Sequence, residues 1–153
     1  MVSVNDLIAP VNPLIRAILR SPLHPVASRA LLVLSWSGRT SGRRYSIPVG
    51  YQRDGDDIVV MLTKPAQKTW WKNFRMPWPA ELLLQGRERT AMGEWVQPGS
   101  EPFFALVEKT LRGTAWMAGQ LGLEDWDPAR GLTPSQRAIV CEQAGAVRFV
   151  LTD

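Results

Sequence analysis

The sequence is poor in the side chains that most often bind metals or act as nucleophiles: its 153 residues include one cysteine, Cys141, and one histidine, His24. A single cysteine excludes an internal disulfide and a zinc site built from several thiolates. The GxSxG, HExxH, phosphate-loop and GxGxxG patterns are also missing. We therefore predict no metal site and no catalytic side chain, so that a cofactor would have to carry the difficult step of any reaction.

Long apolar runs are missing as well. No stretch approaches the roughly 18 apolar residues of a membrane-spanning helix, and Asp6 and Pro10 interrupt the N-terminal segment too early for a signal peptide. We therefore expect a cytoplasmic protein. Residues 13–20 have the pattern of a short helix with an apolar stripe beside two arginines. The stripe suits packing over the opening of the fold, and it would also suit peripheral contact with the inner face of a membrane.

The net charge of +4 is unevenly distributed along the chain. Residues 39–75 contain eight lysines and arginines against three aspartates, a local balance of +5, and the rest of the chain sums to −1. A basic cluster confined to one part of a chain favours an anionic ligand. The alternative is a basic face that contacts only solvent.

The hydrophobic pattern predicts about six short strands and three or four helices in one domain. The predicted strands are 30–36, 43–51, 58–62, 80–85, 90–96 and 146–151. The helices predicted after residue 26 are 69–75, 101 to about 120, and 134–139. Antiparallel hairpins, such as the Asp-Gly turn at 53–56, are clearer than βαβ crossovers. We therefore expect an α+β, mainly β fold, with an N-terminal helix and linker over residues 1–26 and a six-stranded barrel with flanking helices over 27–153.

The strand predicted at 43–51 has one bulky and one small face. Its odd positions carry Arg, Tyr, Ile, Val and Tyr, whereas its even positions carry Arg, Ser, Pro and Gly. A strand with one small face allows a flat molecule to lie against it. Because Pro48 has no backbone N–H, we expect this strand to lie at an edge of the sheet or to contain a bulge.

Five short motifs follow one another between residues 35 and 95. They are Gly38-Arg39-Thr40-Ser41-Gly42, Pro48, Tyr51-Gln52-Arg53-Asp54-Gly55, Thr63-Lys64 and Trp70-Trp71-Lys72-Asn73-Phe74. In this order and spacing they resemble the deazaflavin (coenzyme F420)-dependent nitroreductase family, which has a G-R-x-S-G turn, a strand proline, a D-G hairpin, a Ser/Thr-Lys loop and a W-x-x-N-L helix. The resemblance implies a split β-barrel of the FMN-binding kind and a site for coenzyme F420, with FMN as the alternative cofactor.

This cofactor has a flat deazaflavin ring joined to a ribityl phosphate and a poly-glutamate tail, so its site needs a planar slot and an anion-binding entrance. The resemblance implies that Thr63 hydrogen-bonds the ring and that Lys64 acts as a point charge. Arg39 and Arg43 on the glycine turn suit phosphate or carboxylate oxygens, whereas Arg44 points to the opposite side of its strand. The expected cofactor-binding residues are Arg39, Ser41, Gly42, Arg43, Pro48, Thr63, Lys64, Trp70 and Asn73.

Trp70, Trp116 and Met117 can each be interpreted as a residue of the binding site or as a residue of the hydrophobic core. Trp70 lies one helical turn from Asn73 and would help to close the slot, and it would equally suit core packing. Trp116 and Met117 suit either the substrate side of the site or the core.

The resemblance implies an F420H2-dependent reductase that transfers a hydride to a small, apolar electrophile such as a quinone, an enone or a nitro-type acceptor, as a monomer or a homodimer. Two alternatives stay open: the same barrel with FMN or haem, and a non-catalytic module that binds single-stranded nucleic acid through basic and tryptophan side chains. We favour the reductase and expect no nucleic-acid partner.

Overall fold

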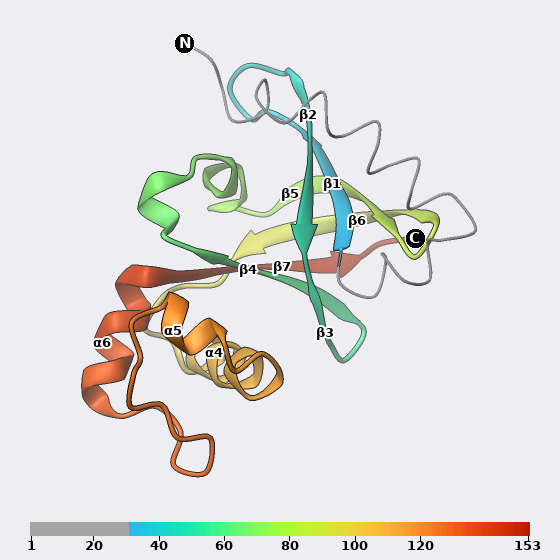
Figure 1. Cartoon of the computed structure of the whole chain (residues 1–153). Coiled ribbons are helices and arrows are strands. Elements are labelled where there is room, and N and C mark those ends of the chain that lie inside the picture. The colour runs from blue at the N-terminus through green and yellow to red at the C-terminus, as the bar shows by residue number, and fades with distance from the viewer. Residues whose placement is uncertain (1–30) are drawn as a thin grey trace.

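The computed structural model describes residues 31–153, which form a curled sheet with a group of helices at one end (Figure 1). The strands are β1 (Leu31–Ser37), β2 (Arg44–Gly50), β3 (Gln52–Asp54), β4 (Asp57–Thr63), β5 (Trp78–Leu84), β6 (Arg87–Trp95) and β7 (Ala144–Leu151). The helices are η1 (Pro65–Gln67), η2 (Trp70–Phe74), α4 (Glu101–Gly113), α5 (Met117–Gln120) and α6 (Pro134–Gln143). The predicted N-terminal helix and the predicted boundary after residue 26 lie outside the described residues.

The described strands form one sheet of seven, in the order β2-β1-β5-β6-β7-β4-β3, and each neighbouring pair is antiparallel. The mainly β, antiparallel architecture is confirmed, but the prediction of six strands was wrong by one. The additional strand is β3, whose three residues are too few to show an alternating pattern. The Asp-Gly turn is confirmed, since Gly55 has a φ of 62° between β3 and β4.

The two edges of the sheet are β2 and β3, although these strands follow each other in the chain. Figure 1 shows them as one path that bends between them, and Tyr51 is the residue at the bend. This continuity brings the two edges together and makes the sheet a half-barrel. Among the described residues β2 pairs with β1 alone, so the edge position predicted for the strand with Pro48 is confirmed.

The inward-facing side chains of the sheet form the main hydrophobic core. Leu32, Leu34 and Trp36 alternate along β1 and are 0–2% exposed. Phe74 of η2 meets Phe149 of β7 in this core, edge to face, at a ring-centroid distance of 5.3 Å. The core therefore reaches from the sheet to the η2 segment and fixes its position against the barrel.

The outer face of β4 and β7 is covered by α4. Ser100 begins this helix by accepting a hydrogen bond from the N–H of Phe103 at 3.3 Å. Leu106, one turn further on, packs against Val59 of β4 and Ala146 of β7. At this point β4 and β7 therefore have hydrophobic side chains on both faces of the sheet. The packing of α4 on the outer face stabilises the barrel wall that β4 forms.

The prediction of a single helix from 101 to about 120 was wrong. α4 ends at Gly113, Thr114 leaves the helical region with φ −142° and ψ 76°, and α5 begins at Met117. α6, in contrast, continues beyond the predicted end at 139, after a capping box between Thr133 and Gln136. In residues 31–153 no helix has the length and apolar character needed to cross a membrane.

An ion-pair cluster joins the β3–β4 hairpin to β7. Arg148 donates from Nη2 to Asp54 at 2.8 Å and from Nη1 to Asp57 at 2.9 Å. The hydrogen bond from Arg148 is the main reason why the pKa of Asp54 lies below its ordinary value of 3.8. A carboxylate with a lowered pKa stabilises the folded state at pH values above its unfolded pKa, and this contribution is lost as the pH falls through the folded pKa.

We expect Arg148→Met to lower the free energy of unfolding by about 1–2 kcal/mol at pH 7, because it removes two charge-assisted hydrogen bonds and leaves two carboxylates side by side. The decrease in the free energy of unfolding should lie at the low end of this range, because the Asp54 side chain is 37% exposed and solvent screens its charge. Urea unfolding at several pH values measures the effect, which should shrink below about pH 4. Arg89→Met, which removes the pair with Asp153, is the control. A loss that stays constant down to pH 2 would contradict the electrostatic origin.

Candidate functional site

Two open grooves lie next to each other beside β2, and the larger one extends across the split of the half-barrel to β4. The larger one, here the apolar groove, has a volume of about 920 Å³. Its walls are residues 47–50 of β2, residues 59–63 of β4, and the segment from Thr114 to Gln120 that contains α5. Lys68 is the only charged side chain among its described lining residues. The groove is therefore suited to a flat, largely apolar molecule.

The smaller one, here the basic groove, has a volume of about 650 Å³ and lies between the turn at 38–41 and the segment 69–76. Arg39, Lys72 and Arg75 line it and are exposed. Within residues 31–153, neither Lys72 nor Arg75 forms an ion pair with a carboxylate. Positive charge without a carboxylate partner in a concave site favours an anionic ligand.

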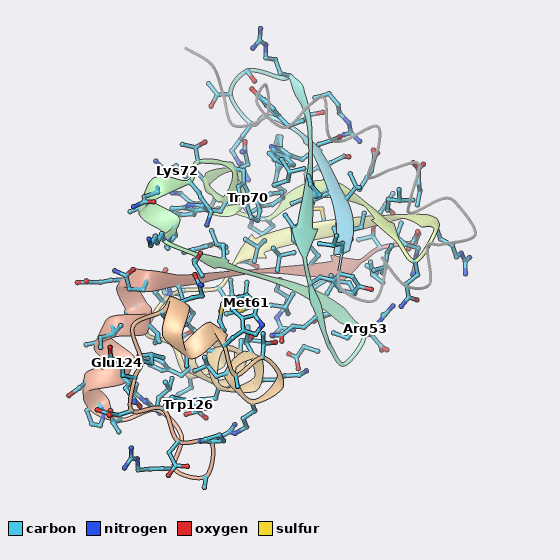
Figure 2. The ribbon with its side chains drawn as sticks, in the orientation of Figure 1. Arg53, Met61, Trp70, Lys72, Glu124 and Trp126 are labelled. Atoms are coloured by element: carbon cyan, nitrogen blue, oxygen red, sulfur yellow. The ribbon has the colours of Figure 1, made fainter. Side chains whose placement is uncertain are left out.

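The two grooves meet at Trp70 and Ile47, which line both of them. Trp70 lies 6.1 Å from the ring of Trp36 and 6.1 Å from that of Phe74. Figure 2 shows Trp70 and Lys72 on the same short segment, and Met61 on β4 toward the helices. The interpretation of Trp70 as a core-packing residue is confirmed, and the same side chain lines both grooves, whereas its role in closing a cofactor slot stays a prediction.

The turn at 38–42 is joined to η2 by Arg39 and Asn73. The backbone N–H of Arg39 donates to Asn73 Oδ1 at 2.9 Å, and Arg39 Nε donates to the Asn73 carbonyl at 3.1 Å. Asn73 Nδ2 in turn donates to the Trp70 carbonyl at 2.9 Å. Both predicted residues therefore border the basic groove, and their polar groups hold its two walls at a fixed separation.

The guanidinium of Arg39 is further committed to the protein itself. Its Nη2 donates to the carbonyls of Met76 at 2.9 Å and Pro77 at 3.1 Å, and it stacks on Trp78 at 4.3 Å. These contacts use most of its donors, so Lys72 and Arg75 are the cations of this groove with donors left for an anion. Neither residue was among the predicted site residues. Their spacing of three, which places them on one face of a helical turn, is the signal that would have indicated them.

The other predicted residues of the glycine turn, Ser41, Gly42 and Arg43, differ in their positions relative to the grooves. Ser41 lines the basic groove, and its Oγ accepts the N–H of Arg43 at 3.2 Å. Gly42 has a φ of 70°, which lets its N–H reach the Gly38 carbonyl at 2.9 Å and close the turn. The Arg43 side chain is exposed and lies outside the described lining of both grooves, and Arg44 pairs with Glu81 on the other face of the sheet.

Two of the three predicted residues Pro48, Thr63 and Lys64 line the apolar groove, one on β2 and one at the end of β4. Pro48 and Thr63 line the groove, whereas Lys64 is exposed outside it, in a left-handed conformation with a φ of 50°. Lys68 occupies the wall instead, with its ammonium donating to the Thr63 carbonyl and lying 3.5 Å from Thr63 Oγ1. No pattern in the sequence distinguishes Lys68 from Lys64, because the inward turn of the 65–69 loop decides between them.

Trp116 and Met117 form part of the α5 wall of the apolar groove. Trp116 is 67% exposed, so it has no core role, while Met117 packs partly against the helix cluster. Both residues follow the break at Thr114, with Trp116 directly before α5 and Met117 at its first position.

No family model and no curated protein matches the chain. Among solved structures, the heme storage protein HutZ from Vibrio cholerae has a TM-score of 0.53 at 11% identity, over 95% of this chain and 91% of its own. An F420-H2 dependent reductase, FDR-A, has a TM-score of 0.51 at 10% identity, over 78% of this chain and 94% of its own. At such identities the similarity establishes a shared fold, which is the split-barrel architecture.

Proposed function

We propose that this chain is a reductase that binds coenzyme F420 across the two grooves, with the ring in the apolar groove and the phosphate and acidic tail in the basic groove. The observation that carries the proposal is the meeting, at Trp70 and Ile47, of an apolar slot and a cluster of cations that form no ion pair within residues 31–153. The five motifs that resemble the F420-dependent family support it. The shared fold with a protein named as an F420-H2 dependent reductase is compatible with it.

The residues present fit such a cofactor. The β2 wall offers Pro48 and Gly50, which leave room for a flat ring, and Thr63 supplies a hydroxyl at the β4 wall. In the basic groove Lys72 and Arg75 are placed for phosphate and carboxylate oxygens. FMN has a single phosphate and no acidic tail, so it would form fewer interactions with these two cations. A haem would need an axial ligand, and no histidine occurs among the described lining residues of either groove.

The protein's part in the reaction is to position the reactants. When bound, the reduced deazaflavin supplies a hydride from its ring. The walls formed by β2 and Trp70 would fix the ring, while Trp116 and Met117 would hold a flat apolar acceptor, such as a quinone or an enone, against it. Holding donor and acceptor atoms at roughly 3–3.5 Å is a major source of rate acceleration and requires no further catalytic side chain at the hydride step.

Titration of the purified protein with F420, FMN and haem tests this proposal, with ring fluorescence or haem absorbance as the readout. We expect F420 to bind with a dissociation constant in the micromolar range or below, and FMN about tenfold more weakly. Protein with reduced F420 should then reduce menadione, a quinone. Tighter binding of haem or FMN than of F420 would contradict the cofactor assignment. Salt-sensitive binding of single-stranded oligonucleotides without F420 binding would instead support the nucleic-acid module.

A further inference from the structure

Among the described residues that line the apolar groove, Lys68 is the one charged side chain. Its ammonium has three N–H donors, of which one donates to the Thr63 carbonyl and a second has Thr63 Oγ1 at 3.5 Å. At least one N–H is therefore left for a molecule in the groove. Lys68 is half-buried, in contrast to Lys64 and Lys72 on either side of it, which are exposed.

The loop that carries Lys68 is held firmly against the barrel. Trp71 Nε1 donates to the carbonyl of Lys68 at 3.1 Å and to that of Pro65 at 2.8 Å. The Trp71 ring stacks on Trp95 of β6 at a centroid distance of 4.2 Å. These contacts fix the backbone of the loop, so the ammonium is positioned at the groove before any ligand binds.

The charges around Lys68 favour release of its proton. Burial lowers the pKa of Lys68 below its ordinary value of 10.5, and repulsion by Lys64 lowers it further. Within residues 31–153 no carboxylate forms an ion pair with Lys68 to oppose this. Tyr51 is the other titratable side chain on the described groove wall, and Glu142 is an exposed carboxylate on α6. A cationic acid with a pKa closer to neutrality transfers its proton more readily.

We infer that Lys68 is the proton donor to the acceptor in the apolar groove, an inference that rests on the proposed function. Addition of a hydride to the β-carbon of an enone forms a C–H bond and leaves an electron pair on the carbonyl oxygen, as an enolate. An N–H bond of the Lys68 ammonium then breaks and an O–H bond forms. The neutral amine recovers its proton from water, and the enol tautomerises to the ketone. The hydride donor is oxidised and the enone is reduced by two electrons.

The test compares Lys68→Gln, Lys68→Arg and wild type with cyclohexenone as acceptor. Because the reaction needs protonated Lys68, wild-type kcat/KM should fall as the pH rises through the pKa of this side chain. In Lys68→Gln this alkaline limb should vanish, and kcat at pH 7 should drop about 100-fold, a typical effect of a general acid. Lys68→Arg keeps the charge, but its pKa is too high for efficient transfer, so it should not restore the rate. The F420 dissociation constant should stay within about threefold in both variants.

A readout without bound cofactor and a matched control complete the test. In the free protein, NMR titration of ¹³C-methylated lysines should show Lys68 losing its proton below pH 10.5, the ordinary pKa of its side chain. Lys109→Gln, which removes an exposed charge on α4 outside both grooves, should leave kcat and its pH profile unchanged.

Four outcomes would overturn the inference while leaving the proposed function intact. They are full activity of Lys68→Arg, survival of the alkaline limb in Lys68→Gln, loss of that limb in Tyr51→Phe instead, and a tenfold weaker F420 affinity in Lys68→Gln with an unchanged pH profile. Failure of wild type to bind F420 would contradict the proposed function itself, and the inference with it.

Discussion

A Phe74→Ala variant is expected to lose about 3–5 kcal/mol of unfolding free energy, as do other fully buried phenylalanines truncated to alanine. Phe74 has no exposed surface and contacts the rings of Trp36, Trp70 and Phe149. Gly93 shows how closely this region is packed, because a Cβ there would come within 2.7 Å of Phe74 and 2.6 Å of Phe149. A cavity at this point cannot be filled by small movements of the neighbours.

The same variant should also lose cofactor affinity, because Phe74 supports the side of Trp70 away from the grooves. Thermal and urea unfolding measure the first effect, with a midpoint decrease on the order of 10 °C. Met76→Ala is the matched control, since Met76 lies two residues further along the same segment and is 64% exposed. A loss below about 1 kcal/mol for Phe74→Ala, or an equal loss for Met76→Ala, would contradict the view that η2 is fixed by the barrel core.

The double variant Lys72→Ala/Arg75→Ala should weaken F420 binding by about 10- to 100-fold. Each of these cations is expected to make a charge-assisted hydrogen bond to the tail, and exposure to solvent reduces each contribution to about one tenfold step. The affinity for FMN should fall less, because its single phosphate has fewer oxygens to pair. Fluorescence titration at two salt concentrations measures both effects, and the variant should show a weaker salt dependence than wild type.

Arg53→Ala/Arg130→Ala is the control for this double variant. It removes the same amount of charge from exposed side chains outside the described lining of both grooves. Equal losses of F420 affinity in the two double variants would show that the net charge of the protein, and not the basic groove, attracts the cofactor.

The sequence predicted the sheet better than the helices, for physical reasons. Alternating side chains and the Asp-Gly turn mark the strands locally, and Pro48 correctly indicated an edge. The helix after Ser100 was predicted too long because its apolar spacing continues past Gly113. Gly113 is the last helical residue and lacks the positive φ of a glycine C-terminal motif, so the end of the helix is set at Thr114, which has a φ of −142°.

The positions of the predicted site residues depend on contacts that the sequence does not show. Within the motif Trp70-Trp71-Lys72-Asn73-Phe74, the side chains of Trp70, Lys72 and Asn73 line the basic groove, and their role in binding a cofactor stays a prediction. Arg39 was predicted as an anion ligand, and its role as a partner of Asn73 depends on a contact between segments 34 residues apart. Whether Lys64 or Lys68 faces the groove is likewise decided by tertiary folding, since local spacing treats both alike.

The split between β2 and β4 makes the apolar groove easier to widen than the basic groove. In the described sheet β2 and β4 are not paired directly: at one end β2 continues into β3, which pairs with β4. Away from that end, their separation depends on the twist accumulated across β1, β5, β6 and β7. We expect that a small change of twist at each pairing would widen the gap at the end far from β3 without breaking a hydrogen bond, so that planar rings of different width would fit. The basic groove is braced by the hydrogen bonds of Arg39 and cannot stretch in this way. Discrimination between cofactors should therefore arise at their anionic ends, with the ring pocket remaining permissive.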